Sequence, residues 1–249
     1  MPNTSAGRPT LDALAAFLQD ALGAAAYPPE EQGGVFRAPE PAGDAAERPL
    51  ARLGIALEYR PGLPAWARRE RLDALFLHRP WRLPEGALPP TVGVLHAHLP
   101  FDDRLTTGDN APLAAALGFR SREVLGVKDG RRIGMLGDVA PASAADWVER
   151  VRGEFGGVEA ELVAEPDRLV SRVAVVGAMN DALVREGARR GAGLYVTGQL
   201  RQPARAAVDE TGIAVAAVGH ERAERWGLRA LARIVGARWP GLLVRVEGR

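Results

Sequence analysis

Val173-Ala174-Val175-Val176-Gly177 is a short apolar run that ends in glycine, and the segment 181–190 after it has a helical pattern. The apolar runs Leu194-Tyr195-Val196 and 213–218 follow further along the chain. Short apolar runs bounded by glycine are typical of buried strands, and a helix between two such strands is typical of a parallel pair. This stretch therefore predicts an α/β fold with a sheet that is at least partly parallel.

The alternation of strands and helices extends over the rest of the chain. Leu11, Leu14, Phe17, Leu18 and Leu22 recur at three- and four-residue intervals, which predicts an amphipathic helix facing a core. Further helices are predicted at 64–72, 112–117, 144–155 and 228–235, and further strands at 53–57, 75–77, 91–96, 133–136 and 158–163. The segments 27–48 and 80–90 are rich in proline or glycine and predict loops.

The two halves of the chain share this rhythm, although their residues differ. Between them, the segment 118–130 is the connection that is richest in glycine and poorest in pattern. A chain of 249 residues is long enough for two lobes of ordinary size. We therefore expect an N-terminal α/β lobe over residues 1–124 and a C-terminal α/β lobe over residues 125–249.

The composition excludes several classes of protein. Apolar residues make up 47% of the chain and charged residues 25%, as is usual for a globular protein. The absence of cysteine excludes disulfides, thiolate metal sites and cysteine nucleophiles. The net charge of +1 indicates neither a nucleic-acid nor a membrane partner. Residues 1–9 lack the pattern of a signal peptide, and no apolar stretch approaches the ~20 residues of a membrane helix. We expect a cytoplasmic protein.

Histidines and acids stand at the ends of three of the predicted strands: His78 at the end of the first, His98 and Asp102 after the second, and His220 and Glu224 after the third. The C-terminal ends of strands are where α/β sheets place their ligands. If a helix begins near His220, that residue and Glu224 share one helical face, one turn apart. An imidazole and a carboxylate together suit Zn, Mn, Fe, Co or Ni. This pattern therefore indicates a site for a divalent metal cation.

The residues alone leave other roles open. A lone histidine at a strand end, such as His78, is usually a hydrogen-bonded filler, and Asp102 could be an ordinary loop acid. Glu224 could pair with Arg222 or Arg225 on the surface.

A larger set of residues occurs in a recognisable order: Leu77-His78-Arg79-Pro80, Ala97-His98-Leu99-Pro100-Phe101-Asp102, Asn110, Thr197-Gly198-Gln199, and Gly219-His220 with Glu224. In these blocks the chain resembles the NIF-three-like family, also called dinuclear-metal-centre hexameric proteins or GTP cyclohydrolase type-two homologues. The family has a second histidine where this chain has Arg79, and an acid where it has Gln199. The blocks and their spacing cover nearly the whole chain.

The resemblance implies the NIF-three-like fold, with two interlinked α/β lobes of similar topology. It also implies that His78, His220 and Glu224 bind one ion, and that Asp102 and the shared Glu224 remain for a second. Arg79 cannot coordinate a cation, and its charge repels one. We therefore expect one well-formed site and a weak or absent second site.

Two alternatives concern position 79, where the family has a histidine and this chain has an arginine. Arg79 could turn away to bind a substrate phosphate, or His96 or His98 could replace the missing ligand. Otherwise His98 is expected to hydrogen-bond to a ligand carboxylate and orient it, without touching the metal itself.

The function implied by the resemblance is that of a metal-dependent hydrolase acting on a small, nucleotide-like molecule, assembled as a toroidal homohexamer. A non-catalytic metal-binding or metal-chaperone ring is the alternative. Nucleic-acid binding in the cavity of the ring has less support, because Arg131-Arg132 and Arg189-Arg190 are short basic pairs of the kind usually found on solvated surfaces. The chain has neither a P-loop nor a dinucleotide fingerprint, so any nucleotide would have to bind with the help of the metal.

Overall fold

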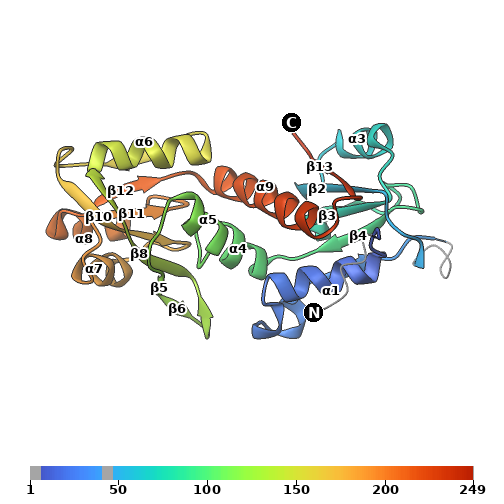
Figure 1. Ribbon diagram of the computed structural model, residues 1–249, viewed down its shortest axis with the longest axis horizontal. Helices are drawn as coiled ribbons and strands as arrows, with labels where there is room; N and C mark the ends of the chain where they lie inside the picture. The colour runs from blue at the N-terminus through green and yellow to red at the C-terminus, as the bar shows by residue number, and fades with distance from the viewer. Residues whose placement is uncertain (1–6, 41–46, 249) are drawn as a thin grey trace. The chain divides into compact units, whose positions relative to one another are not determined.

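The computed structural model describes residues 7–40 and 47–248, which form two compact units (Figure 1). The first unit comprises residues 1–101 and 228–249, and the second comprises residues 102–227. The chain leaves the first unit within helix α4 (Leu99–Leu105) and returns to it within helix α9 (His220–Arg238). The units are thus interlinked along the chain. The boundaries between the units lie within α4 and α9, whereas the sequence pattern placed a single boundary between residues 124 and 125.

The first unit contains a five-stranded sheet with the order β1-β4-β3-β2-β13. Its strands are β1 (Gly34–Arg37), β2 (Arg52–Glu58), β3 (Ala74–Arg79), β4 (Gly93–His96) and β13 (Leu243–Val246). Strands β4, β3, β2 and β13 are parallel, and β1 joins the edge antiparallel to β4. Before α4, the helical elements that lie wholly within the described residues are α1 (Leu11–Ala21), η1 (Ala24–Ala26), η2 (Pro29–Glu31), α3 (Leu63–Glu70) and η3 (Pro80–Arg82).

Strand β3 is buried and sends alternate side chains to the two faces of this sheet. Leu75 and Leu77 belong to the core cluster that includes Trp66 of α3. Phe76 and His78 lie against Phe101 instead, with ring centroids 5.9 and 4.7 Å from it. The aromatic side of β3 is therefore the side that receives the start of α4.

The second unit contains a six-stranded sheet with the order β5-β8-β10-β11-β12-β9. Its strands are β5 (Glu123–Val124), β8 (Gly134–Ser143), β9 (Ala160–Leu162), β10 (Leu169–Val176), β11 (Leu194–Thr197) and β12 (Ala214–Ala217). Its helical elements between α4 and α9 are α5 (Ala111–Ala116), α6 (Ala144–Phe155), α7 (Asp181–Arg189), η4 (Gln202–Ala204) and α8 (Arg205–Thr211). Strands β10, β11 and β12 are parallel, as predicted, and antiparallel strands flank them on both sides.

Helix α6 shows how the local sequence sets an element. The Ser143 hydroxyl accepts a hydrogen bond from the backbone N–H of Asp146, which caps the first turn. Gly156 ends the helix in the left-handed conformation, at φ 73°. Its buried side chains include Trp147, Val148 and Val151, which helical spacing puts on one face. Figure 1 shows α6 on one side of the sheet and α7 and α8 on the other.

Several short elements differ from the sequence pattern. The segment 27–48, predicted as loop, contains β1, whose Val35 and Phe36 are exposed, so no buried alternation marks it as a strand. A hairpin of β6 (Val127–Lys128) and β7 (Arg131–Arg132) begins within the segment 118–130, which has the least sequence pattern. Its turn residues Asp129 and Gly130 have φ values of 51° and 76°, as a two-residue hairpin turn requires.

Some expectations fall outside the described residues. Residues 41–46 of the predicted loop lie there, as do residues 1–6 of the stretch that lacks the pattern of a signal peptide. Among the described helices, none is both long enough and apolar enough to span a bilayer.

Candidate metal centre

His78 lies near the end of β3 and is fully buried. Its Nδ1 lies 3.0 Å from the backbone carbonyl oxygen of Ala97. Because a carbonyl oxygen only accepts, Nδ1 must be the donor, so the neutral ring carries its lone pair on Nε2. A histidine held in this way has the tautomer and orientation typical of a metal ligand.

His98 and Asp102 stand one turn apart at the start of α4. Nδ1 of His98 lies 3.4 Å from the Oε2 carboxylate atom of Glu31, so the same reasoning places the lone pair of its neutral ring on Nε2. Asp102 lies in the first turn of α4, and its backbone carbonyl accepts a 2.6 Å hydrogen bond from the Thr106 hydroxyl.

Ligand atoms of His78, His98 and Asp102 all lie within 4.8 Å of one another. The rings of the two histidines are stacked at a tilt of 42°, with centroids 5.0 Å apart. Two imidazoles and a carboxylate fit a divalent transition metal or zinc better than calcium. These three residues are therefore a group able to hold a metal ion.

His96 lies two residues before His98 and outside this group. Burial lowers the pKa of His96; Glu31 opposes that change and His98 adds to it. Its ring meets Phe36 edge-on, with centroids 5.9 Å apart. Burial thus disfavours the charged form of His96, whose ring packs against Phe36.

His220 and Glu224 lie in the second unit, on the first turns of α9. Nε2 of His220 lies 3.1 Å from Oε1 of Glu224, so the two side chains share one helical face as the spacing predicted. Glu224 is buried, and the imidazole of His220 is 71% exposed. The surface-pair alternative fails for Arg225, which instead binds Glu221 at 2.9 Å.

The four predicted ligands thus form two groups. One group contains His78 from β3 and Asp102 from α4, and the other contains His220 and Glu224, both from α9. The convergence of all four stays a prediction. His98, expected as an orienting residue, stands in the first group as a candidate ligand. The signal that could have identified it is its spacing of four residues from Asp102, the same spacing that drew attention to the other pair.

Arg79, the residue in the place of the second histidine, is turned towards Glu58 on the neighbouring strand. Nε of Arg79 lies 3.3 Å from Oε2 of Glu58, its register partner in the parallel pair. Arg82 binds the same carboxylate oxygen at 2.8 Å. The charge of Arg79 is therefore already paired within the first unit.

Asn110, another residue of the ordered blocks, has a structural role. Its Oδ1 accepts from the backbone N–H of Leu113, which caps α5, and its Nδ2 donates to the carbonyl oxygen of Thr106. The side chain is fully buried. Asn110 therefore ties the end of α4 to the start of α5.

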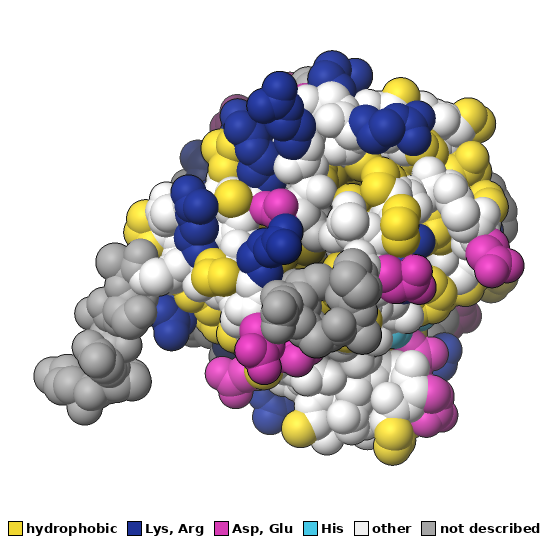
Figure 2. Space-filling model, turned by 90° about the vertical axis from the view of Figure 1, so that its right-hand side faces the viewer, with side chains coloured by type: hydrophobic (Ala, Val, Ile, Leu, Met, Phe, Trp, Pro, Cys, Tyr) yellow, Lys and Arg dark blue, Asp and Glu magenta, His cyan; other side chains and the backbone are white. Residues whose placement is uncertain are grey.

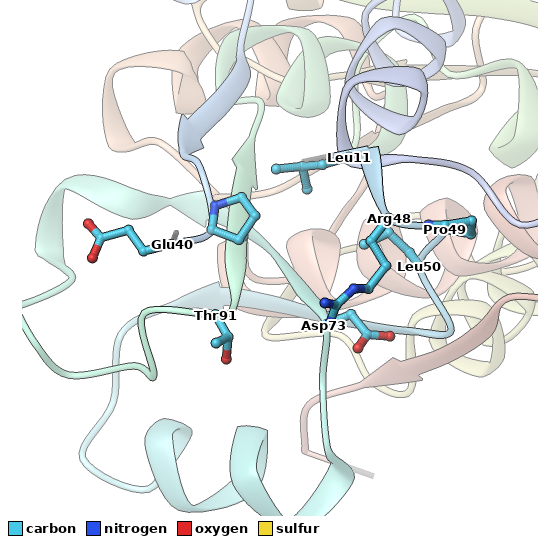
Figure 3. A pocket seen from close by; sticks show the side chains of 9 residues that line it. Leu11, Glu40, Arg48, Pro49, Leu50, Asp73 and Thr91 are labelled. Atoms are coloured by element: carbon cyan, nitrogen blue, oxygen red, sulfur yellow. The ribbon is translucent and has the colours of Figure 1, made fainter. Parts of the chain in front are cut away.

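A separate pocket of about 80 Å³ lies in the first unit, near the start of β2 and β3 (Figure 3). One of the two acids in its lining, Asp73, accepts hydrogen bonds at Oδ2 from the backbone N–H groups of Ala51 and Arg52, at 2.7 and 2.9 Å. Asp73 therefore fixes the backbone where β2 begins. The described residues that line the pocket include no histidine.

Asp73→Ala is expected to lower the free energy of unfolding of the first unit by about 2 kcal/mol, because two backbone donors lose a charged acceptor. Urea unfolding followed by circular dichroism measures this change. The control is Asp209→Ala, which removes an exposed partner of Arg205 and should cost less than about 0.5 kcal/mol. Equal effects of the two substitutions would contradict the role given to Asp73.

Comparison with known proteins places these residues in a family context. The model of the Duf34/NIF3 (NGG1p interacting factor 3) family matches residues 82–247, more than half of the chain. The matched segment includes His98, Asp102, His220 and Glu224, and His78 lies just before it.

Curated relatives carry the name GTP cyclohydrolase 1 type 2 homolog. One from Pseudomonas aeruginosa is 30% identical over 149 residues, covering 59% of this chain and 58% of that protein. One from Neisseria meningitidis serogroup A is 29% identical over 173 residues, covering 69% and 63%. The chain thus matches less than two thirds of the length of these relatives. The crystal structure of a Thermus thermophilus protein has a TM-score of 0.71 at 21% identity, covers 97% of this chain and 98% of its own, and shares its fold.

Proposed function

Because the chain belongs to the Duf34/NIF3 family, we propose that it is a divalent-metal-binding protein and a metal-dependent hydrolase of a small molecule. The observation that carries the proposal is the group of His78, His98 and Asp102, with ligand atoms within 4.8 Å of one another. His220 and Glu224 complete the proposed ligand set, as the ordered sequence blocks predict. The metal is Zn, Mn, Fe, Co or Ni, since imidazole and carboxylate ligands suit these ions.

If these residues held such a metal, the pKa of its bound water would be lowered, which would supply hydroxide near neutral pH. The residues of the chain hold the metal and orient its ligands. The Ala97 carbonyl fixes the tautomer of His78, and Glu31 does the same for His98. Asp102 contributes negative charge that favours a cation, and the helix α4 holds it in register with His98.

Exposed aromatic side chains beside the histidines favour a substrate with a planar ring. Trp81 is 54% exposed, and its ring meets His98 edge-on with centroids 5.0 Å apart. Phe36 is also exposed and stands against His96. A purine or pterin ring can stack on such a surface, so we propose a nucleotide-like substrate, in keeping with the name of the curated relatives.

A non-catalytic metal-binding or metal-chaperone ring remains the second candidate, and both candidates include a homohexamer. Nucleic-acid binding is the third. On the face drawn in Figure 2, Lys and Arg side chains stand in separate groups with apolar and acidic side chains between them, which gives no continuous track for a backbone of phosphates.

The test begins with protein stripped by a chelator and reloaded with each of the five metals. A hydrolase should convert nucleotides, phosphoesters or cyclic amides only in the reloaded form, and chelation should abolish the turnover. Metal binding without turnover on any of these substrates would favour the ring assembly instead. A monomer mass by light scattering would count against the hexamer in both candidates.

His98→Ala is expected to weaken metal binding at least ~10-fold, because it removes one imidazole from the group. The matched control is His96→Ala, which removes the same side chain two positions away and should change affinity less than ~3-fold, within the uncertainty of such a measurement. Calorimetric titration of the stripped variants measures both. An unchanged affinity in His98→Ala would return His98 to the orienting role that the sequence first indicated.

A further inference from the structure

Three arginines converge on one buried carboxylate in the second unit. Nη1 of Arg104 lies 2.8 Å from Oδ2 of Asp109, and Nη1 of Arg132 lies 3.9 Å from the same oxygen. Nη1 of Arg122 lies 3.3 Å from the other oxygen, Oδ1. The Asp109 side chain is only 4% exposed, so one acid anchors three guanidinium groups.

These residues come from separate segments that are each held in place. Arg104 lies on α4, and Arg122 directly precedes β5. Arg132 lies on β7 of the tight hairpin. The loop that carries Asp109 is compact: a Cβ at Gly108 would come within 2.2 Å of the Asp103 carbonyl oxygen, so only glycine permits this approach.

The charges of this cluster do not balance. Three arginines face one aspartate, which leaves an excess of two positive charges. Within residues 7–40 and 47–248, neither Arg122 nor Arg132 has another acid within ion-pair distance. The nearby Arg131 adds no free charge, because it binds Asp103 at 2.6 Å.

The excess charge is accessible to a ligand. The side chain of Arg122 is 41% exposed and that of Arg132 is 59% exposed, whereas the acid beneath them is buried. Each guanidinium has five N–H donors, and a contact through Nη1 uses only part of them. Two arginines fixed by a shared anchor lose less rotamer freedom on binding than free surface arginines would.

We propose that Arg104, Arg122 and Arg132 form an anion site that binds a phosphate group, with Asp109 as its anchor. Arg122 and Arg132 provide the contacts, since planar guanidinium groups match phosphate oxygens in geometry and charge. Arg104 is 25% exposed and mainly balances Asp109 from the side of α4. The site does not depend on the metal centre, because none of its residues is a proposed metal ligand.

The test uses the chelator-stripped full-length protein, so that phosphate cannot bind through a metal. Inorganic phosphate and pyrophosphate are titrated by calorimetry at low ionic strength. The double variant Arg122→Gln/Arg132→Gln should weaken binding of both probes at least ~10-fold, because two charge-assisted donors are lost. The variant Arg122→Lys/Arg132→Lys keeps the charge but lacks the planar guanidinium. Its affinity for both probes should lie between that of the wild type and that of the Gln double variant.

The matched control is Arg185→Gln/Arg205→Gln, which removes two arginines of similar exposure (40% and 50%) from ion pairs on α7 and α8. It should leave the affinity for phosphate unchanged. Circular dichroism confirms that each variant is folded before its affinity is compared. If folded wild type binds neither probe, or if the two Gln double variants weaken binding equally, the proposal is wrong.

Discussion

His78→Ala is expected to lower the affinity for the bound metal by at least ~100-fold, a larger loss than outer-shell changes usually cause. His78 is the most buried member of the group with His98 and Asp102, and the Ala97 carbonyl fixes its ring. The next residue of β3, Arg79, cannot take its place, because it binds Glu58 and stays protonated. Calorimetric titration of stripped protein with Zn or Mn measures the loss.

A buried histidine also contributes packing, so the metal effect has to be separated from a folding effect. The thermal midpoint of the wild type should rise on adding metal, and the rise should vanish in the variant, because ligand binding stabilises only a folded site. His78→Gln keeps most of the side-chain volume and serves as the second variant. A folded variant that still gains the full metal-dependent rise would contradict the role of His78.

The regular elements of the fold were predictable because their periodicity reflects burial. Helices α1 and α6 have apolar side chains at helical spacing, and residues 173–176 of β10 and 194–196 of β11 are apolar runs buried on both faces. Strand β1 was not predictable, since two of its four residues are exposed and edge pairing with β4 leaves no alternation. Where an element owes its structure to a neighbour, its own residues carry little signal.

The candidate site was predictable in part for a related reason. His78 and Asp102 stand near strand ends that the sequence marks clearly, so their proximity could be anticipated. Whether His98 and Asp102 lie on one helical face depends on where α4 begins, and Pro100 makes that start hard to locate from the sequence. The arginines around Asp109 could not be predicted at all, because their convergence depends on the tertiary placement of α4, β5 and β7.

Arg79→His is expected to raise bound metal from about one ion per chain towards two, since a neutral imidazole restores the ligand that the family has there. The sequence indicated two reasons for a weak second site: the missing imidazole and the charge of Arg79. The structure reduces the weight of the second reason, because Glu58 already pairs with that charge at 3.3 Å.

Arg79→Met separates these two causes, because it removes the charge without adding a ligand. If charge repulsion limits the second site, Met should raise the metal content as His does. If the missing imidazole limits it, the metal content of Arg79→Met should stay at about one ion per chain, and only that of Arg79→His should rise.

Glu224→Ala should act in the opposite direction to Arg79→His, because two ions without a bridging carboxylate repel each other. Elemental analysis after dialysis against limiting metal measures all three variants beside the wild type. Two tightly held ions in the unaltered protein would contradict this account of Arg79, and would point to His98 as the replacement ligand.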